Sequence, residues 1–117
     1  MKIRVEIKEG EYFLKLLNIL RHIPPFSLLR NQEIEVLAKF YEYNHKLREI
    51  PTEQRNLVLF SHDTKEKIAK ELHLKTSRLY NIITGIKKVG IIKGDTLIPK
   101  YTLYKHNEVI FSFENEE

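Results

Sequence analysis

The segment 63–103 constrains the fold more than any other part of the chain, because two short helical patterns, within 63–89, and a hairpin signal, within 91–103, follow one another in it. The first helix is predicted to begin at Asp63, an N-cap acceptor with Glu66 three residues on. The second ends at Gly90, a residue that readily adopts left-handed backbone. A Gly-Asp pair at 94–95, between two apolar runs, then predicts a β-hairpin.

The spacing of apolar residues indicates which faces of these two helices are buried. In the first helix, Ile68, Ala69 and Leu72 form one stripe. Leu74 lies in the turn, and the second helix is expected to be capped by Thr76 or Ser77. The residues of the second helix that are predicted to continue the core are Leu79, Ile82, Ile83 and Ile86.

The residues at 68–79, IAKELHLKTSRL, followed by IKKVGII at 86–92, resemble the winged helix-turn-helix superfamily of DNA-binding proteins. In that family a small residue in the first helix, matched by Ala69, lets the two helices cross closely. An apolar turn residue, matched by Leu74, fills the space between them. The second helix ends in a basic pair and a glycine before the wing, matched by KKVG at 87–90. The resemblance spans about forty residues.

Two features depart from the family pattern. The turn at 73–75 lacks the usual glycine. Gly85 lies inside the second helix, where glycine costs about 1 kcal/mol relative to alanine. We expect Gly85 to permit the close approach of another backbone.

The resemblance implies that the second helix lies in the major groove of DNA with its outward face toward the bases. Asn81 would pair with adenine and Arg78 with guanine, each contact contributing about 1–3 kcal/mol of discrimination. Hydroxyl groups at the helix start would hold a phosphate, and lysines there and on the wing would neutralise the backbone. The predicted DNA-binding residues are Thr76, Ser77, Arg78, Tyr80, Asn81, Thr84, Lys87, Lys88, Lys93 and Lys100.

The charge distribution favours a polyanionic partner. The whole chain carries a formal charge of +4. The segment 63–105 holds ten basic and four acidic residues, a net +6, so the remainder is mildly acidic. A basic half of this kind is typical of a nucleic-acid-binding face, although a lysine-rich solvated surface would give the same count.

The remaining segments predict a single domain, 1–117, that is mainly α with small β (α+β). The two terminal strands alternate apolar and polar residues and are natural pairing partners. The apolar run at 57–60 fits either a brief helix or an extended piece. The predicted elements are strands at 2–8 and 108–114, helices at 11–21 and 31–43, the latter capped by Asn31, and loops at 22–27 and 44–52.

Several classes of function are not supported by the sequence. The chain has no cysteine, and its five histidines are scattered without metal-ligand spacing. No phosphate-binding loop or nucleophile elbow is evident, and no carboxylate pair lies in an apolar setting. We therefore expect no enzyme activity, cofactor, metal or small-molecule substrate. The N-terminus alternates apolar and charged residues, and no apolar run approaches the roughly 20 residues of a membrane span, so a cytoplasmic protein is predicted.

Two functions remain open. The first is a small transcriptional regulator that binds double-stranded DNA, with a homodimer as a possible form. The second is a virion or assembly protein that docks protein through the same fold, with Phe40, Tyr43 and the strands near Ile3 and Phe111 at its interfaces. Lys, Ile, Asn and Glu are plentiful and Gly and Ala few, and the chain is similar in style to small winged-helix proteins of tailed bacteriophages.

Overall fold

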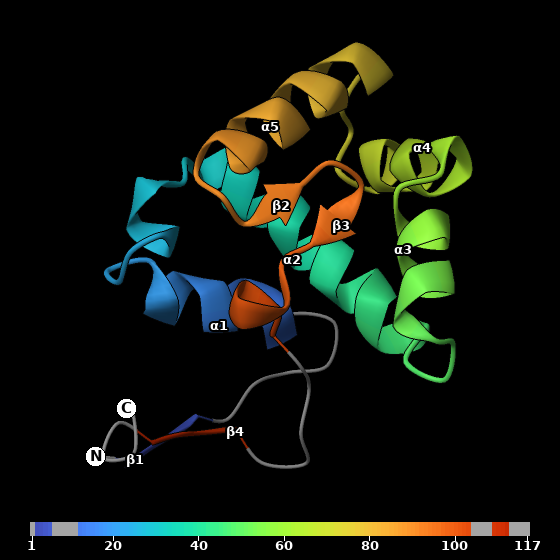
Figure 1. The fold of residues 1–117 in the computed structure, drawn as a ribbon. Helices are drawn as coiled ribbons and strands as arrows, with labels where there is room; N and C mark the ends of the chain where they lie inside the picture. Colours follow the sequence, from blue (N-terminus) through green and yellow to red (C-terminus); the bar gives the residue numbers. More distant parts are fainter. Residues whose placement is uncertain (1, 6–11, 104–108, 113–117) are drawn as a thin grey trace.

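The computed structural model describes residues 2–5, 12–103 and 109–112. These residues form a mainly helical fold with small antiparallel β-structure, as the α+β prediction requires (Figure 1). In chain order the elements are β1 (Lys2–Val5), α1 (Tyr12–Leu20), the short 3-10 turn η1 (Phe26–Leu28), α2 (Asn31–Lys46), α3 (Thr52–Leu59), α4 (His62–Glu71), α5 (Thr76–Lys88), β2 (Ile92–Lys93), β3 (Thr96–Leu97), the second 3-10 turn η2 (Pro99–Tyr101) and β4 (Val109–Ser112).

Helix α2 lies at the centre of the helical body, in contact with α1, α3 and α5 (Figure 1). Its apolar residues occupy more than one stripe, so it is buried on several sides. Phe40, which lies off the main stripe, is fully buried and stacks on Phe60 at the end of α3, with ring centroids 5.0 Å apart. Helix α2 therefore packs against more than one neighbouring element. Phe40 is not available as an interface residue.

Three helix starts differ from the sequence prediction by one or two residues. The N-cap of α2 is Arg30 instead of Asn31, and Glu33 accepts a hydrogen bond from the Arg30 amide at 2.7 Å. The N-cap of α4 is Ser61 instead of Asp63. The Ser61 hydroxyl accepts from the Thr64 amide at 3.3 Å, which draws the helix start back to His62. A helix can begin wherever a nearby acceptor satisfies its first amides, so neighbouring polar residues compete for that position.

The N-cap of α5 is Lys75, which provides no side-chain cap. The prediction that Thr76 or Ser77 caps this helix is therefore wrong. The turn before it is made by His73, whose φ of 56° is the left-handed conformation that a glycine would normally supply. Gly90 ends the helix with a φ of 86°, as predicted.

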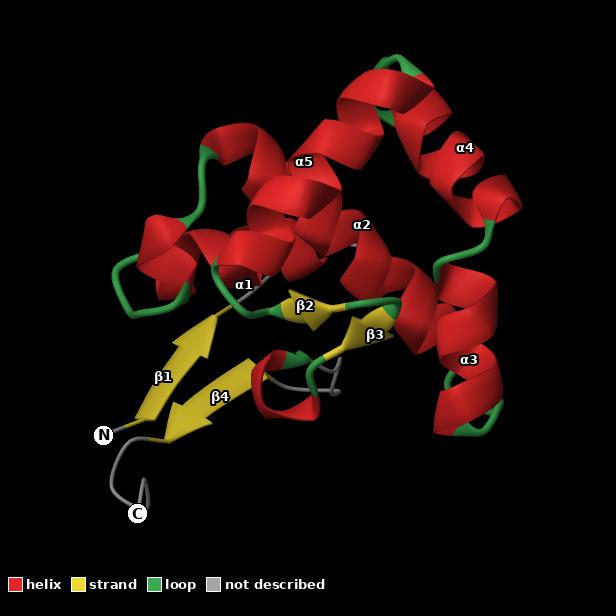
Figure 2. Cartoon of the chain, turned by 45° about the horizontal axis from the view of Figure 1, so that its top comes forward, coloured by secondary structure: helices red, strands yellow, loops and turns green. Residues whose placement is uncertain are grey.

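The predicted hairpin is present after α5. Strands β2 and β3 pair with Ile92 opposite Leu97, and Gly94 takes a φ of 60° in the connection (Figure 2). Two-residue strands have little stability of their own. Burial of Ile92 and Leu97 against the helical body holds this hairpin in place.

The connection between α2 and α4 holds more helix than the sequence predicted. Helix α2 continues to Lys46, and α3 begins at Thr52 directly after Pro51, a residue suited to helix starts. Arg55 of α3 donates hydrogen bonds to the carbonyls of Leu47 and Ile50, at 3.2 and 2.8 Å, and so fixes the turn that separates the helices.

The predicted pairing of the two terminal strands is confirmed for Lys2–Val5 and Val109–Ser112. They run antiparallel, with Lys2 opposite Ser112 and Val5 opposite Val109, and form a ribbon separate from the hairpin (Figure 2). The rest of the predicted strands 2–8 and 108–114 lies outside the described residues. Within the described part of the chain, none of the helices is long and apolar enough to cross a membrane.

Candidate nucleic-acid interface

Helix α5 has one buried and one exposed face, divided as the sequence predicts. Leu79, Ile82, Ile83 and Ile86 are buried in the core. Of the residues predicted to contact DNA on this helix, Thr76 is half-buried. The exposed ones are Ser77, Arg78, Tyr80, Asn81, Thr84, Lys87 and Lys88.

The exposed face of α5 forms one wall of a groove of about 650 Å³, which we call the α5 groove. The other wall is the start of α2, with Leu28 of η1 at its edge. From α5 the groove is lined by Arg78, Asn81, Thr84 and Lys88, and from the opposite wall by Arg30, Asn31, Gln32 and Glu33. The structure thus brings four of the predicted residues together beside a part of the chain that the sequence analysis had not linked to them.

The orientation of Arg78 differs from that of a side chain pointing freely into solvent. Its Nη2 donates a hydrogen bond to Gln32 Oε1 at 2.6 Å, which turns the guanidinium toward α2. Arg78 therefore lies along the groove wall, where its remaining N–H groups can still meet an acceptor. Nothing in the local sequence indicates Gln32 as a partner, because the two residues are 46 positions apart.

Asn81 and Thr84 lie one helical turn apart on the same face. The Thr84 hydroxyl donates to the Tyr80 carbonyl of its own helix at 3.0 Å, so only its lone pairs remain for a ligand. The Asn81 side chain has no hydrogen-bond partner among the described residues. Its amide is thus the exposed group on α5 best able to offer a donor and an acceptor side by side.

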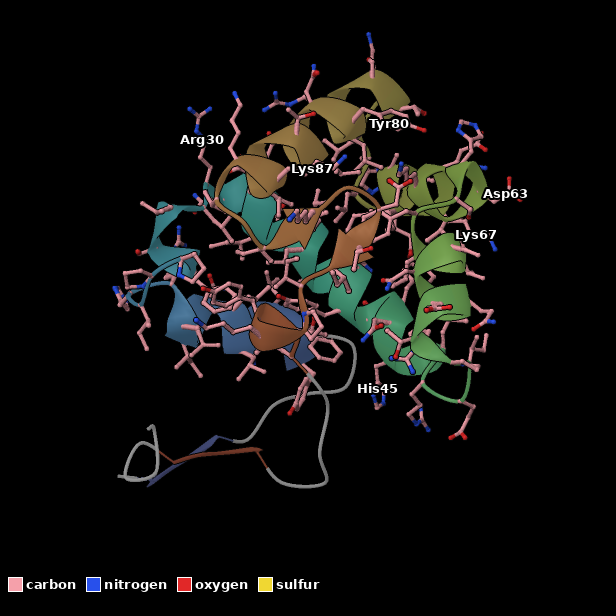
Figure 3. All side chains as sticks on the ribbon, viewed as in Figure 1. Arg30, His45, Asp63, Lys67, Tyr80 and Lys87 are labelled. Carbon is pink, nitrogen blue, oxygen red and sulfur yellow. The ribbon has the colours of Figure 1, made fainter. Side chains whose placement is uncertain are left out.

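Tyr80 extends the exposed face of α5 toward α4. Its hydroxyl lies 3.3 Å from Nδ1 of His62, and the Lys65 ammonium lies 4.8 Å from its ring centroid. These contacts orient an aromatic ring at the surface, and Figure 3 shows Tyr80 at the end of α5 near α4. Sequence reasoning missed His62 and Lys65, since both act through a contact between helices.

Gly85 lies where α5 approaches the first turn of α2. A Cβ atom at this position would lie 2.0 Å from Glu33 Oε2. The close neighbour of Gly85 is therefore the Glu33 carboxylate. The expectation that Gly85 permits the approach of another backbone is wrong. Glycine at 85 leaves room for the carboxylate that accepts from the Arg30 amide at the start of α2.

The lysines predicted to lie on the wing are exposed but not clustered in one element. Lys93 is in β2 opposite Thr96, and Lys100 is in η2, where its ammonium lies 5.5 Å from the Tyr101 ring centroid. Lys87 leaves α5 on the side of the hairpin (Figure 3). None of these lysines lines the α5 groove.

A second groove, of about 700 Å³, lies between α1, α2 and the end of α4, and we call it the α1 groove. Apolar atoms contribute most of its surface, from residues such as Phe13, Ala38 and Leu72. Tyr43 packs nearby and donates to Glu71 Oε1 at 2.6 Å. The pKa of the Tyr43 phenol is raised above its usual value. Burial is the largest cause, followed by this hydrogen bond and the negative charge of Glu71.

No group of three or more histidine, aspartate or glutamate side chains in the described residues could hold a metal ion. Comparison of the chain with family models, curated proteins and solved structures finds no match.

Proposed function

We propose that this protein binds double-stranded DNA as a winged helix-turn-helix regulator, with α4 and α5 as the helix-turn-helix and β2–β3 as the wing. The observation that carries the proposal is the exposed face of α5, which presents Arg78, Asn81 and Lys88 to one groove while the opposite face is buried. A recognition helix needs this division, because it must be held by the core and still reach base edges.

Charge supports the same partner. Most of the net positive charge falls in the segment 63–105, which contains both helices and the hairpin. Lys88 lies on the face of α5 that lines the groove, and Lys93 lies on the hairpin. Contacts between lysine side chains and phosphates supply much of the affinity of DNA-binding proteins, and this affinity falls as the salt concentration rises.

The side chains suggest a division of roles. Asn81, with a free amide, is assigned to base reading, for which adenine presents the matching donor and acceptor. Arg78, turned toward Gln32, is assigned to the backbone next to the bases instead of to guanine. Ser77, exposed at the start of α5, is assigned to a phosphate contact.

A second candidate function, protein docking within a virion or other assembly, is favoured by the α1 groove and by exposed apolar side chains. Leu57 of α3 is 73% exposed and Leu28 of η1 is 64% exposed. Exposed apolar surface of this kind is found at protein interfaces. The α1 groove shares no lining residue with the α5 groove, so protein docking there would leave the exposed face of α5 uncovered.

The experiment that tests the proposal is fluorescence anisotropy with a labelled random duplex, titrated from low to physiological salt. The wild-type chain is compared with an Arg78→Ala/Asn81→Ala/Lys88→Ala variant whose fold is checked by circular dichroism. We expect micromolar or tighter binding that falls steeply with salt and is lost in the variant. Equal binding by both proteins, or none by the wild type at low salt, would overturn the proposal and favour protein docking.

A further inference from the structure

The α5 groove contains an excess of positive charge that comes from two separate parts of the chain. Arg78 and Lys88 belong to α5, whereas Arg30 precedes α2. Figure 3 shows the Arg30 side chain rising on the same side of the molecule as α5. Among the described residues no ion pair of these three cations with an acid is observed.

The single acid in the groove does not neutralise this charge fully. Glu33 lines the groove, but one carboxylate oxygen accepts from the Arg30 amide at 2.7 Å, and Gly85 packs against the other. The first amide at the start of α2 is thus already satisfied from within the chain. An anion entering the groove would meet side-chain cations and not a vacant helix terminus.

We propose that the α5 groove seats a phosphodiester of the DNA backbone and that Arg30, outside the helix-turn-helix, is one of its contacts. The inference rests on the proposed DNA binding and extends its interface from α5 to the start of α2. Arg30 and Lys88 contact the phosphodiester from opposite walls, and Arg78, near the start of α5 and fixed by Gln32, offers its remaining N–H groups to an adjoining part of the backbone.

The uncharged residues among those that line the groove favour DNA over an acidic peptide. Asn81 and Thr84 line the same groove, so a backbone seated there lies beside the side chain assigned to base reading. Leu28, at the edge, offers an apolar contact for a deoxyribose ring. The cavity is also open and polar, as expected of a surface that follows a nucleic-acid backbone.

The test compares Arg30→Gln with Arg48→Gln, a matched control beyond the other end of α2, where Arg48 is exposed and bonds to the His45 carbonyl. Arg30→Gln retains the backbone amide that bonds to Glu33, so α2 should still fold, and circular dichroism checks this. Anisotropy is measured over a salt series on several duplexes of different sequence.

We expect Arg30→Gln to weaken binding severalfold on every duplex and to lower the slope of log affinity against log salt by about one. Arg30→Lys should restore the slope, and Arg48→Gln should bind as the wild type does. Unchanged binding by Arg30→Gln, with binding lost in the triple α5 variant, would overturn the inference and leave DNA binding intact. Absence of duplex binding by the wild type would overturn both.

A labelled oligoglutamate peptide of matched charge provides the remaining arm. Tighter binding of this peptide than of the duplex, lost in Arg30→Gln, would show an acidic polypeptide as the occupant and overturn the assignment to DNA. Displacement of the duplex by inorganic phosphate, at constant ionic strength and at millimolar concentration, would show a site for free phosphate and would also overturn it.

Discussion

The α5 groove and the α1 groove are similar in size but differ in how their charges are arranged. In the α1 groove, Lys39 lies 3.7 Å from Glu71 and Lys46 lies 3.4 Å from Glu42, so opposite charges satisfy one another. In the α5 groove, Arg30, Arg78 and Lys88 face one already engaged carboxylate.

Helix α2 therefore separates two surfaces that suit different kinds of binding partner. Both grooves are lined in part by α2, one by its first turn and the other by residues further along. Unpaired cations attract a polyanion over a long range, whereas paired surface charges contribute little. Nucleic acid is therefore expected at the α5 groove, and apolar contact with protein at the α1 groove.

The largest expected effect comes from truncating a core side chain of α2, the helix that lines part of both grooves. Phe40→Ala should cost about 3–5 kcal/mol, because it leaves a cavity beside Phe60 in the fully buried centre of α2. Urea unfolding followed by circular dichroism measures the loss. Leu57→Ala, at a position 73% exposed, is the control and should change stability by less than about 0.5 kcal/mol. Similar losses in the two variants would contradict the central placement of α2.

The next largest effect compares a charge reversal in the α5 groove with the same reversal in the α1 groove. Lys88→Glu in the α5 groove should reduce duplex affinity about tenfold or more at low salt, because it would replace the proposed phosphate contact by a negative charge that repels the backbone. Lys46→Glu makes the same change in net charge at the α1 groove and should have a much smaller effect. Anisotropy titrations of both variants decide the point. If they lose affinity equally, overall charge governs binding and the comparison of the grooves fails.

The sequence predicted those features that depend on neighbouring residues. The buried face of α5, the left-handed Gly90 and the hairpin around Gly94 follow from local spacing and backbone preference, and all are present. The helix starts were misplaced by one or two positions, because Ser61 and Asp63 are both suitable caps and only the packed structure selects Ser61.

The missing parts of the candidate site were those made by tertiary contact. Arg30 and Gln32 join Arg78 in one groove only because α2 packs against α5. A sequence pattern indicates the spacing of residues along one helix, and it gives no information on a partner 46 residues away. The exposed face of α5 was predicted, but the opposite wall of its groove was not.

A smaller effect tests how closely α2 and α5 meet at the groove. Gly85→Ala should gain about 1 kcal/mol from helix propensity but displace the Glu33 carboxylate from the Arg30 amide, so its net effect should be near zero. In a Glu33→Ala background the same substitution should stabilise by about 1 kcal/mol. A double-mutant cycle by urea unfolding measures this coupling. Additive effects would show that Gly85 and Glu33 do not constrain each other.

The smallest effect concerns Tyr43, on the side of α2 that faces α4. Tyr43→Phe removes the 2.6 Å hydrogen bond to Glu71 and should cost about 0.5–1.5 kcal/mol near neutral pH. The folded state raises the pKa of this phenol above its unfolded value of 10.0, so it favours the protonated form. The contribution of Tyr43 to stability is therefore fully present below pH 10 and decreases as the pH rises above it.

The difference in stability between wild type and Tyr43→Phe should accordingly narrow above pH 10, since only the wild type can ionise at this position. Unfolding curves for the two proteins at pH 7, 9 and 10.5 measure it. The comparison with Phe removes the titration of lysines and other tyrosines, which the two proteins share. A difference that stays constant or widens over this range would show that Glu71 does not hold the phenol in its protonated form. Duplex affinity at pH 7 should be unchanged by the substitution, because Tyr43 is outside the α5 groove. A loss of affinity would mean that the two sides of α2 are coupled and that the contrast between the grooves is incomplete.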